Sequence, residues 1–168
     1  VVVDAGQSGV RVHEAVGHPL EADGNRKKTS ILWDKLGQMV AKPGVTIYDD
    51  PTIPHYRGSM NIDDEGTVPT HTPLIEKGKL VGFLQDRLSA KLMSMPLNGH
   101  GRRDGYQNVP IPRMANTNLA KGDMDPAEII ASVPKGFFAV TYQGGQVQDS
   151  GKFTFSVNMG YLIENGKL

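Results

Sequence analysis

The 168-residue chain contains no cysteine, so disulfide bonds are excluded and any metal site built within it must use histidine and carboxylate ligands. It also has no excess charge of either sign, because 18 Lys and Arg residues balance 18 Asp and Glu residues. Domains that bind polyanions through a broad electrostatic footprint carry a clear basic excess, so direct nucleic-acid binding is not expected. No apolar run approaches the roughly 18 residues that span a bilayer, and no membrane partner is expected.

The chain does contain enough apolar sequence, 38% of its residues, to build a hydrophobic core. Its length predicts a single domain over residues 1–168. Twenty glycines and 11 prolines indicate many turns and short elements. No signal-peptide pattern is present and the sequence does not begin with Met, so we expect a piece of a longer, cytoplasmic protein.

The order of the predicted elements favours an α+β fold, mostly antiparallel sheet with a few short helices. Strands are predicted within residues 1–12 (before a turn at Gln7-Ser8-Gly9), at 45–48, 60–62, 137–142 and 152–157, and as a hairpin over 73–84. Short helices are predicted over 10–17, 86–95 and 126–133, loops over 24–30 and 98–118, and a turn at Gly144-Gly145. Because strands and helices do not alternate regularly, a doubly wound sheet is not expected.

A seven-residue segment is nearly repeated, as LIEKGKL at 74–80 and LIENGKL at 162–168. The first copy continues into a return strand, whereas the second ends with the chain. Asn-Gly at a hairpin turn calls for a partner strand. The sequence therefore predicts a chain that stops within a hairpin and belongs to a longer protein.

The segment VHEAVGHPLEAD, residues 12–23, concentrates the residue types that bind and use a metal ion. Metalloproteases with an H-E-x-x-H motif place two histidines four apart on one helix face, but His13 and His18 are five apart. On a regular α-helix this spacing points the two rings roughly 140° away from each other. A rigid α-helix would not bring both to one ion.

Three local features offer a remedy. Gly17 gives backbone freedom, Pro19 ends the helix near His18, and a π-bulge would bring fifth neighbours to one face. A catalytic zinc site needs three protein ligands, and Glu14 has the chemistry of the base that takes a proton from water. The spacing alone leaves two interpretations open, a metal site on a distorted helix or a solvated surface cluster. Glu21 and Asp23 are further candidate oxygen ligands, but an exposed acidic turn explains them equally well.

The chain resembles the TldD/PmbA family over nearly its whole length, and in particular the TldD branch with its H-E-x-x-x-H motif. The resemblance rests on these segments, in this order: HEAVGH, LEAD, GNRKKTS, NIDDEGT, LIEKGKLVGFLQDRLSAKLM, NGHGRRDGYQNVPIPRMANTN and GGQV with SGKFTFSVNMGYLIENGKL. Pro19 stands where many relatives carry Gly. Members are peptide-maturation metalloproteases, also named modulators of DNA gyrase.

This resemblance implies a C-terminal-domain fragment of a zinc metallopeptidase that hydrolyses flexible peptides. It implies that His13 and His18 bind Zn²⁺ and that Glu14 is the general base or acid. The family's third ligand is a cysteine beyond the matched stretch, so the isolated chain is expected to be feeble or inactive. Expected partners are a peptide substrate bound as an extended strand, and a second copy or a PmbA-like subunit. The competing hypothesis is a non-catalytic scaffold or regulatory module.

The other polar groups are predicted to have structural or solvent-exposed positions. His55, His71 and His100 are expected to be surface or locally hydrogen-bonded histidines, and the acidic run 63–65 a solvated turn. Arg102, Arg103 and Arg113 are candidates for a substrate carboxylate, with solvation as the default. Trp33 is expected to pack near Ile31 and Leu36.

Overall fold

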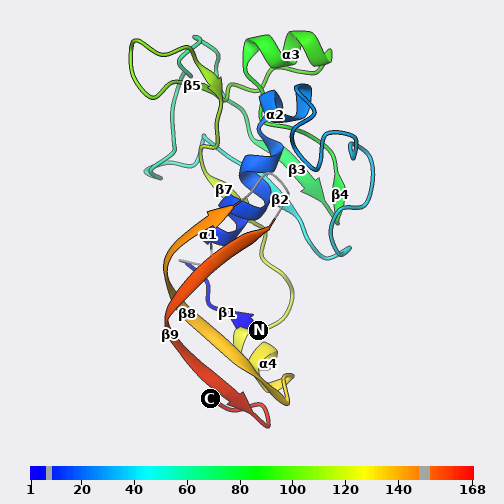
Figure 1. The fold of residues 1–168 in the computed structure, drawn as a ribbon, viewed down its shortest axis with the longest axis vertical. Helices are drawn as coiled ribbons and strands as arrows, with labels where there is room; N and C mark the ends of the chain where they lie inside the picture. Colours follow the sequence, from blue (N-terminus) through cyan, green and yellow to red (C-terminus); the bar gives the residue numbers. More distant parts are fainter. Residues whose placement is uncertain (7–8, 148–151) are drawn as a thin grey trace.

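The computed structural model describes residues 1–6, 9–147 and 152–168 (Figure 1). The strands are β1 (Val2–Val3), β2 (Ile47–Asp49), β3 (Thr72–Glu76), β4 (Lys79–Leu80), β5 (Gly101–Arg102), β6 (Ile111–Pro112), β7 (Thr117–Leu119), β8 (Lys135–Val147) and β9 (Phe153–Glu164). The helices are α1 (Gly9–Val12), a π-helical turn (His13–Gly17), a 3₁₀ turn (His18–Leu20), α2 (Ala22–Arg26), α3 (Arg87–Met93) and α4 (Pro126–Ala131). The α+β class with antiparallel strands is confirmed.

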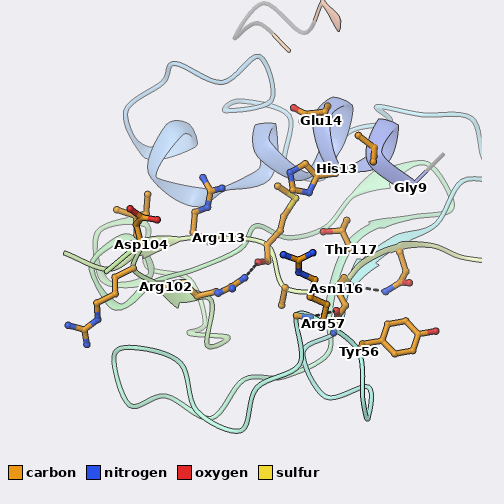
Figure 2. Close-up of a pocket in the computed structure, with 17 residues that line it drawn as sticks. Gly9, His13, Glu14, Tyr56, Arg57, Arg102, Asp104, Arg113, Asn116 and Thr117 are labelled. Atoms are coloured by element: carbon orange, nitrogen blue, oxygen red, sulfur yellow. Dashed lines mark hydrogen bonds between the residues drawn. The ribbon is translucent and has the colours of Figure 1, made fainter. Parts of the chain in front are cut away.

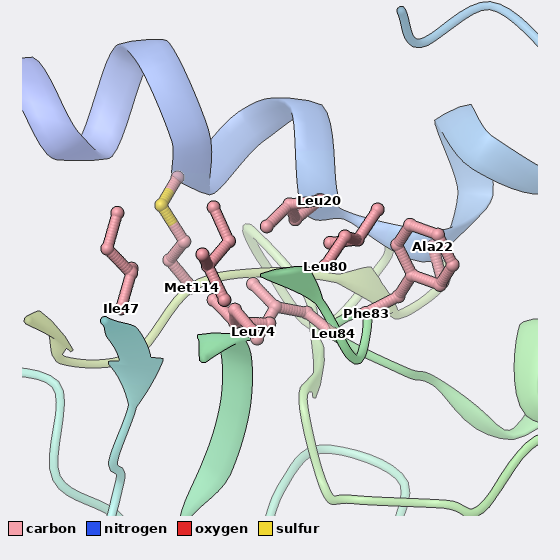
Figure 3. Close-up of a cluster of buried hydrophobic side chains, with 9 residues drawn as sticks. Leu20, Ala22, Ile47, Leu74, Leu80, Phe83, Leu84 and Met114 are labelled. Carbon is pink, nitrogen blue, oxygen red and sulfur yellow. The ribbon is translucent and has the colours of Figure 1, made fainter. Parts of the chain in front are cut away.

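A four-stranded antiparallel sheet, in the order β4-β3-β2-β7, carries the core. The helical segment that begins at α1 ends over this sheet, where Leu20 and Ala22 pack with the sheet residues and with Phe83 (Figure 3). Fully burying a leucine or phenylalanine side chain contributes roughly 1.5–3 kcal/mol. Backbone hydrogen bonds from Leu84 N to Leu20 O and from Ala22 N to Leu84 O, both 2.9 Å, fix the end of the helical segment to the stretch that follows β4.

Strands β8 and β9 form a long antiparallel hairpin that extends away from this body, with β1 parallel to β8 (Figure 1). Several large apolar side chains on β9 face solvent, including Phe153, Val157 and Leu162. None of the helices in the described part of the chain is long and apolar enough to cross a membrane.

Several sequence predictions are confirmed where local chemistry decides the structure. The hairpin predicted over 73–84 forms as β3 and β4, but its return strand ends at Leu80 and does not continue to Leu84. Its two turn residues both have positive φ, 47° at Lys77 and 85° at Gly78. The helices predicted over 86–95 and 126–133 form as α3 and α4. In the structure Asp86 caps α3 by accepting a hydrogen bond from Ser89 N, and Asp125 caps α4 in a capping box.

Other predictions are wrong where tertiary pairing or side-chain chemistry intervenes. Residues 60–62 form no strand, and α2 covers the first part of the predicted loop 24–30. The predicted loop 98–118 contains β5, β6 and the start of β7. Gly144-Gly145 lies inside β8 as an irregularity in register, with φ of 62° at Gly144. The predicted turn at 7–9 falls partly outside the described residues.

Candidate metal centre

The helix that carries His13 and His18 is locally a π-helix, over His13–Gly17. The backbone N–H of His18 donates to the carbonyl of His13, five residues earlier, so the fifth neighbour returns to the same face. The two imidazole rings meet edge to face, with 4.7 Å between their centroids and an 84° interplanar angle. Of the three proposed remedies, the π-bulge is the one that the structure contains.

Gly17 serves a different purpose from the one predicted. Its φ of −58° and ψ of −59° are ordinary helical angles, which any residue can adopt. A Cβ at this position would lie 1.9 Å from Met114 Sδ. The absence of a side chain therefore lets the core methionine pack against the π-turn. Pro19 lies in the 3₁₀ turn, and the helical segment ends at Leu20, two residues after His18.

His13, Glu14 and His18 form a group with the donor set of a metal site. One possible ligand atom from each lies within 4.8 Å of the others, and all three residues are partly buried. Glu14 Oε2 and His18 Nε2 are 3.9 Å apart. Imidazole nitrogens and carboxylate oxygens both bind zinc, so the residues fit that ion in type and spacing. They supply two nitrogen ligands of the three protein ligands that a catalytic zinc site uses.

A second carboxylate, that of Glu21, orients His18 by contacting the ring nitrogen that lies away from Glu14. His18 Nδ1 lies 3.2 Å from Glu21 Oε2, and this contact leaves Nε2 turned toward Glu14. Glu21 is buried, and its Oε1 is compensated by Arg113 Nε at 3.5 Å. Glu21 is therefore not part of an exposed acidic turn. Asp23 is separate from the group and pairs with Lys27 at 3.2 Å.

The two histidines differ in their affinity for protons. The hydrogen bond that His18 donates to the Glu21 carboxylate raises the pKa of His18, against the effect of its burial. Burial lowers the pKa of His13, and the neighbouring His18 lowers it further. A lowered pKa keeps His13 neutral near pH 7, which is the form that binds a metal ion.

His13 and Glu14 line an open pocket of about 950 Å³ (Figure 2). Its walls bring together segments that are far apart in the sequence: α1, the loop before Gly58, the strand β5 region and the stretch from Arg113 into β7. Arg102, Arg103 and Arg113, which the sequence named as candidates, all reach this pocket. Arg57 also lines it, and sequence reasoning missed it because no motif surrounds this residue.

The remaining histidines lie outside the metal group. His55 is exposed, as predicted, whereas His100 and His71 have hydrogen-bonding partners. His100 is fully buried between Thr72 Oγ1 and the carbonyl of Arg113, at 3.2 Å from each. His71 pairs with Asp50 at 3.1 Å.

The acidic run is not the solvated turn that was predicted, because Asp63 is buried. Its carboxylate accepts backbone hydrogen bonds from Glu65, Thr67 and Gly101. Trp33 is 43% exposed, with Lys28 Nζ 4.9 Å from its ring centroid.

Comparison with known proteins identifies the family of this chain. Residues 1–168 match the family described as the PmbA/TldA metallopeptidase C-terminal domain. The chain belongs to this family. The resemblance found in the sequence is thereby confirmed, and the relatives that the chain matches are named metalloproteases.

Individual relatives of this PmbA/TldA domain carry consistent names. The chain is 48% identical to a metalloprotease TldD homolog of Haemophilus influenzae and 49% identical to one of Buchnera aphidicola, each over 100% of the chain and 35% of the relative. The chain thus spans about a third of the length of the curated relatives it matches.

Among solved structures, TldE from Thermococcus kodakarensis superposes with a TM-score of 0.84 at 26% identity, over 98% of this chain and 38% of that one. A candidate modulator of a DNA gyrase from Thermotoga maritima superposes with a TM-score of 0.83 at 28% identity, over 96% and 37%.

Proposed function

We propose that this chain supplies the two histidine ligands and the general base of a zinc-dependent peptidase. The observation that carries the proposal is the π-turn, which converts an unfavourable five-residue spacing into a pair of facing imidazoles beside Glu14. A π-helix is rare, occurs mostly as a single turn inside an α-helix, and is frequently found at functional sites. A solvated cluster with no role would not need this distortion.

Each residue of the group has a distinct task in peptide hydrolysis. Zinc, when bound, polarises a carbonyl and lowers the pKa of a water molecule to about 7. His13 and His18 hold the ion, and Glu21 keeps the Nε2 atom of His18 facing the site by occupying Nδ1. Glu14 accepts the proton of the attacking water and delivers it to the leaving amine.

The two histidines leave the protein ligand set one short, and this chain has no cysteine. We propose that the third ligand comes from residues beyond these 168, as the family resemblance implies with its cysteine. The expected partner is a second copy of the chain or a PmbA-like subunit. The isolated chain should then bind zinc weakly and cleave peptides slowly or not at all.

The substrate proposed for this site is an extended, flexible peptide. Strand β7 is at one edge of the four-stranded sheet, and its residues Thr117 and Asn118 line the same pocket as His13. An extended peptide that adds to such an edge gains main-chain hydrogen bonds with little demand on its sequence. This arrangement supports a peptidase of broad specificity.

The test uses the longer protein that contains this chain. Glu14→Gln should lower kcat by about 10²- to 10⁴-fold, because the base is lost, while zinc content measured by atomic absorption stays the same. His13→Ala should lose zinc as well as activity. His71→Ala removes an exposed histidine outside the group and serves as the control. Unchanged cleavage by Glu14→Gln, or equal zinc content in His13→Ala and His71→Ala, would contradict the proposal.

A further inference from the structure

We propose that the arginines in the pocket beside His13 bind a carboxylate of the peptide substrate, with Arg57 and Arg102 as the main contacts. The inference deepens the proposed peptidase function and rests on it. It names a substrate class: peptides with a carboxylate close to the scissile bond, from either the chain's C-terminus or an Asp or Glu side chain.

The charge balance of the pocket is the first argument. Four arginines line it, against two carboxylates, Glu14 and Asp104. The chain as a whole has a formal net charge of zero, so this pocket has a local excess of positive charge. Such a concentration raises the local density of anionic ligands, and concave sites focus the effect.

The second argument is which arginines are already neutralised. Arg103 pairs with Asp64, with Nε 3.8 Å from Oδ1, and Arg113 pairs with Glu21 at 3.5 Å. Arg57 and Arg102 form no ion pair with any carboxylate in residues 1–6, 9–147 and 152–168. Two guanidinium groups therefore face the pocket with their charges uncompensated.

The third argument is the placement of these two groups. Arg102 is half-buried, and one of its terminal N–H groups donates to the carbonyl of Met114, the same residue that packs against the π-turn (Figure 2). This contact holds the guanidinium in place and leaves other donors of its planar fork free to reach a ligand. Arg57 comes from a different segment, and its guanidinium points into the pocket below the ring of His13 (Figure 2).

Guanidinium groups on two walls of one pocket suit a carboxylate. Arginine donates two parallel N–H···O bonds to a carboxylate, which fixes the orientation of the anion as well as its position. A peptide held in this way by its carboxylate would present the neighbouring amide to His13 and Glu14. The proposed pairing of the peptide with the edge strand β7 supplies affinity that does not depend on the peptide's sequence. The arginines add a preference for peptides that have a carboxylate near the scissile bond.

The experiment uses the longer protein and four peptides of otherwise identical sequence. Each has a free or an amidated C-terminus, and either Glu or Gln at the residue after the scissile bond. Wild-type protein should cleave the best carboxylate-bearing peptide with a kcat/KM at least tenfold above the peptide that has neither charge. If kcat/KM depends on whether the C-terminus is free or amidated, the bound carboxylate is the C-terminal one. If it depends on Glu or Gln, the bound carboxylate is that of the side chain.

Arg57→Met and Arg102→Met should remove this preference, so that the ratio of kcat/KM for the carboxylate-bearing peptide to kcat/KM for the uncharged peptide falls to about one. Arg57→Lys should retain part of it, because charge is kept and the bidentate geometry is lost. Arg87→Met, at an exposed arginine on α3 outside the pocket, is the matched control and should keep the full preference.

Equal cleavage of all four peptides by wild type, or a preference that survives both Met variants, would overturn the carboxylate site. Binding of fluorescent peptides to Glu14→Gln provides a second readout, in which the same preference should appear without turnover. If Glu14→Gln still cleaves peptides while Arg57→Met loses the preference, the assigned base is wrong and the carboxylate site stands. The two failures are thus distinguishable.

Discussion

Glu21 links the metal group to the rest of the molecule at the scale of single residues. Its carboxylate touches His18 on one side and Arg113 on the other, and it is buried. A histidine that binds a metal is usually oriented by a partner at its other ring nitrogen. The side chain of Glu21 therefore decides which nitrogen of His18 is available.

We predict that Glu21→Gln weakens zinc binding by about 10- to 100-fold. The amide keeps the size of the side chain but loses the charge that stabilises the His18 ring and compensates Arg113. Zinc affinity is measured by competition with a chromophoric chelator, and folding by circular dichroism. Asp23→Asn, in a carboxylate outside the group, should leave affinity unchanged. Equal affinities for the two variants would contradict the orienting role of Glu21.

His100 gives a pH-dependent contribution to stability. Burial lowers its pKa below the unfolded value of about 6.5, against the effect of Asp49. The folded state then binds the proton less readily than the unfolded state, so this stability is present above pH 6.5 and is lost as the pH falls below it. The loss approaches about 1.4 kcal/mol per pH unit until the lowered pKa is reached.

Urea unfolding at pH 7.5, 6.5 and 5.5 tests this prediction. As the pH is lowered over this range, the free energy of unfolding of His100→Gln should decrease less than that of the wild type. His71→Gln, at an exposed histidine, should match the wild-type slope. Parallel curves for His100→Gln and wild type would show that His100 is not the group responsible.

The π-turn is the decisive feature at the scale of elements. It occupies one turn between α1 and the 3₁₀ turn, and it acts as a single-residue insertion in a helix. Removing one residue from it should restore an ordinary α-helix without moving the segments on either side. A helix that has no such turn cannot absorb the same change.

We predict that deletion of Ala15 keeps the fold and keeps zinc affinity within about tenfold of wild type. The deletion places the two histidines four apart, which on an α-helix puts them on one face. Deletion of a buried alanine in α3, Ala90, is the control and should destabilise the protein severely. Equal loss of thermal stability in both deletions would contradict this view of the π-turn.

The elements that could be predicted from sequence are those fixed by neighbouring residues. The caps at Asp86 and Asp125 and the turn at Lys77-Gly78 depend on contacts within four residues, and all three are present. The facing histidines were predictable as one possibility, because a π-turn is a local event. By contrast, β5 and β6 exist only because they pair with each other across the predicted loop.

Some features of the site required the tertiary fold. The need for Gly17 comes from Met114, almost 100 residues later. Arg57 and Arg102 line one pocket because the fold brings a loop and strand β5 together there. No spacing rule connects such residues. The burial of Asp63 has the same cause, since one of its three backbone donors is Gly101.

The whole molecule exposes more surface than a compact protein of its size. Its solvent-accessible surface is 10470 Å², whereas a compact monomer of 18.2 kDa has about 8,100 Å². The surplus of surface area follows from the shape of the molecule, because the β8–β9 hairpin projects from the body (Figure 1). A surplus of this order is comparable to the area that a stable interface covers.

We predict that small-angle scattering of the 168-residue chain gives a radius of gyration clearly above the roughly 15 Å of a compact chain of this length. The projecting hairpin is the reason. Forward scattering over a dilution series gives the mass and separates an elongated monomer from an oligomer. A monomer with a radius near 15 Å would show that the hairpin folds back onto the body in solution.

The π-turn also bears on how sites of this kind are found. A search pattern that fixes the interval between two ligands assumes one type of helix in advance, and a four-residue interval passes over His13 and His18. Here a five-residue interval on a π-helix does what a four-residue interval does on an α-helix, because it brings two histidines to one face. What a shared metal ion requires is that the two rings lie close together, and their centroids are 4.7 Å apart. Patterns for helical metal sites therefore gain coverage if they accept a five-residue interval and then check each hit by ring-to-ring distance.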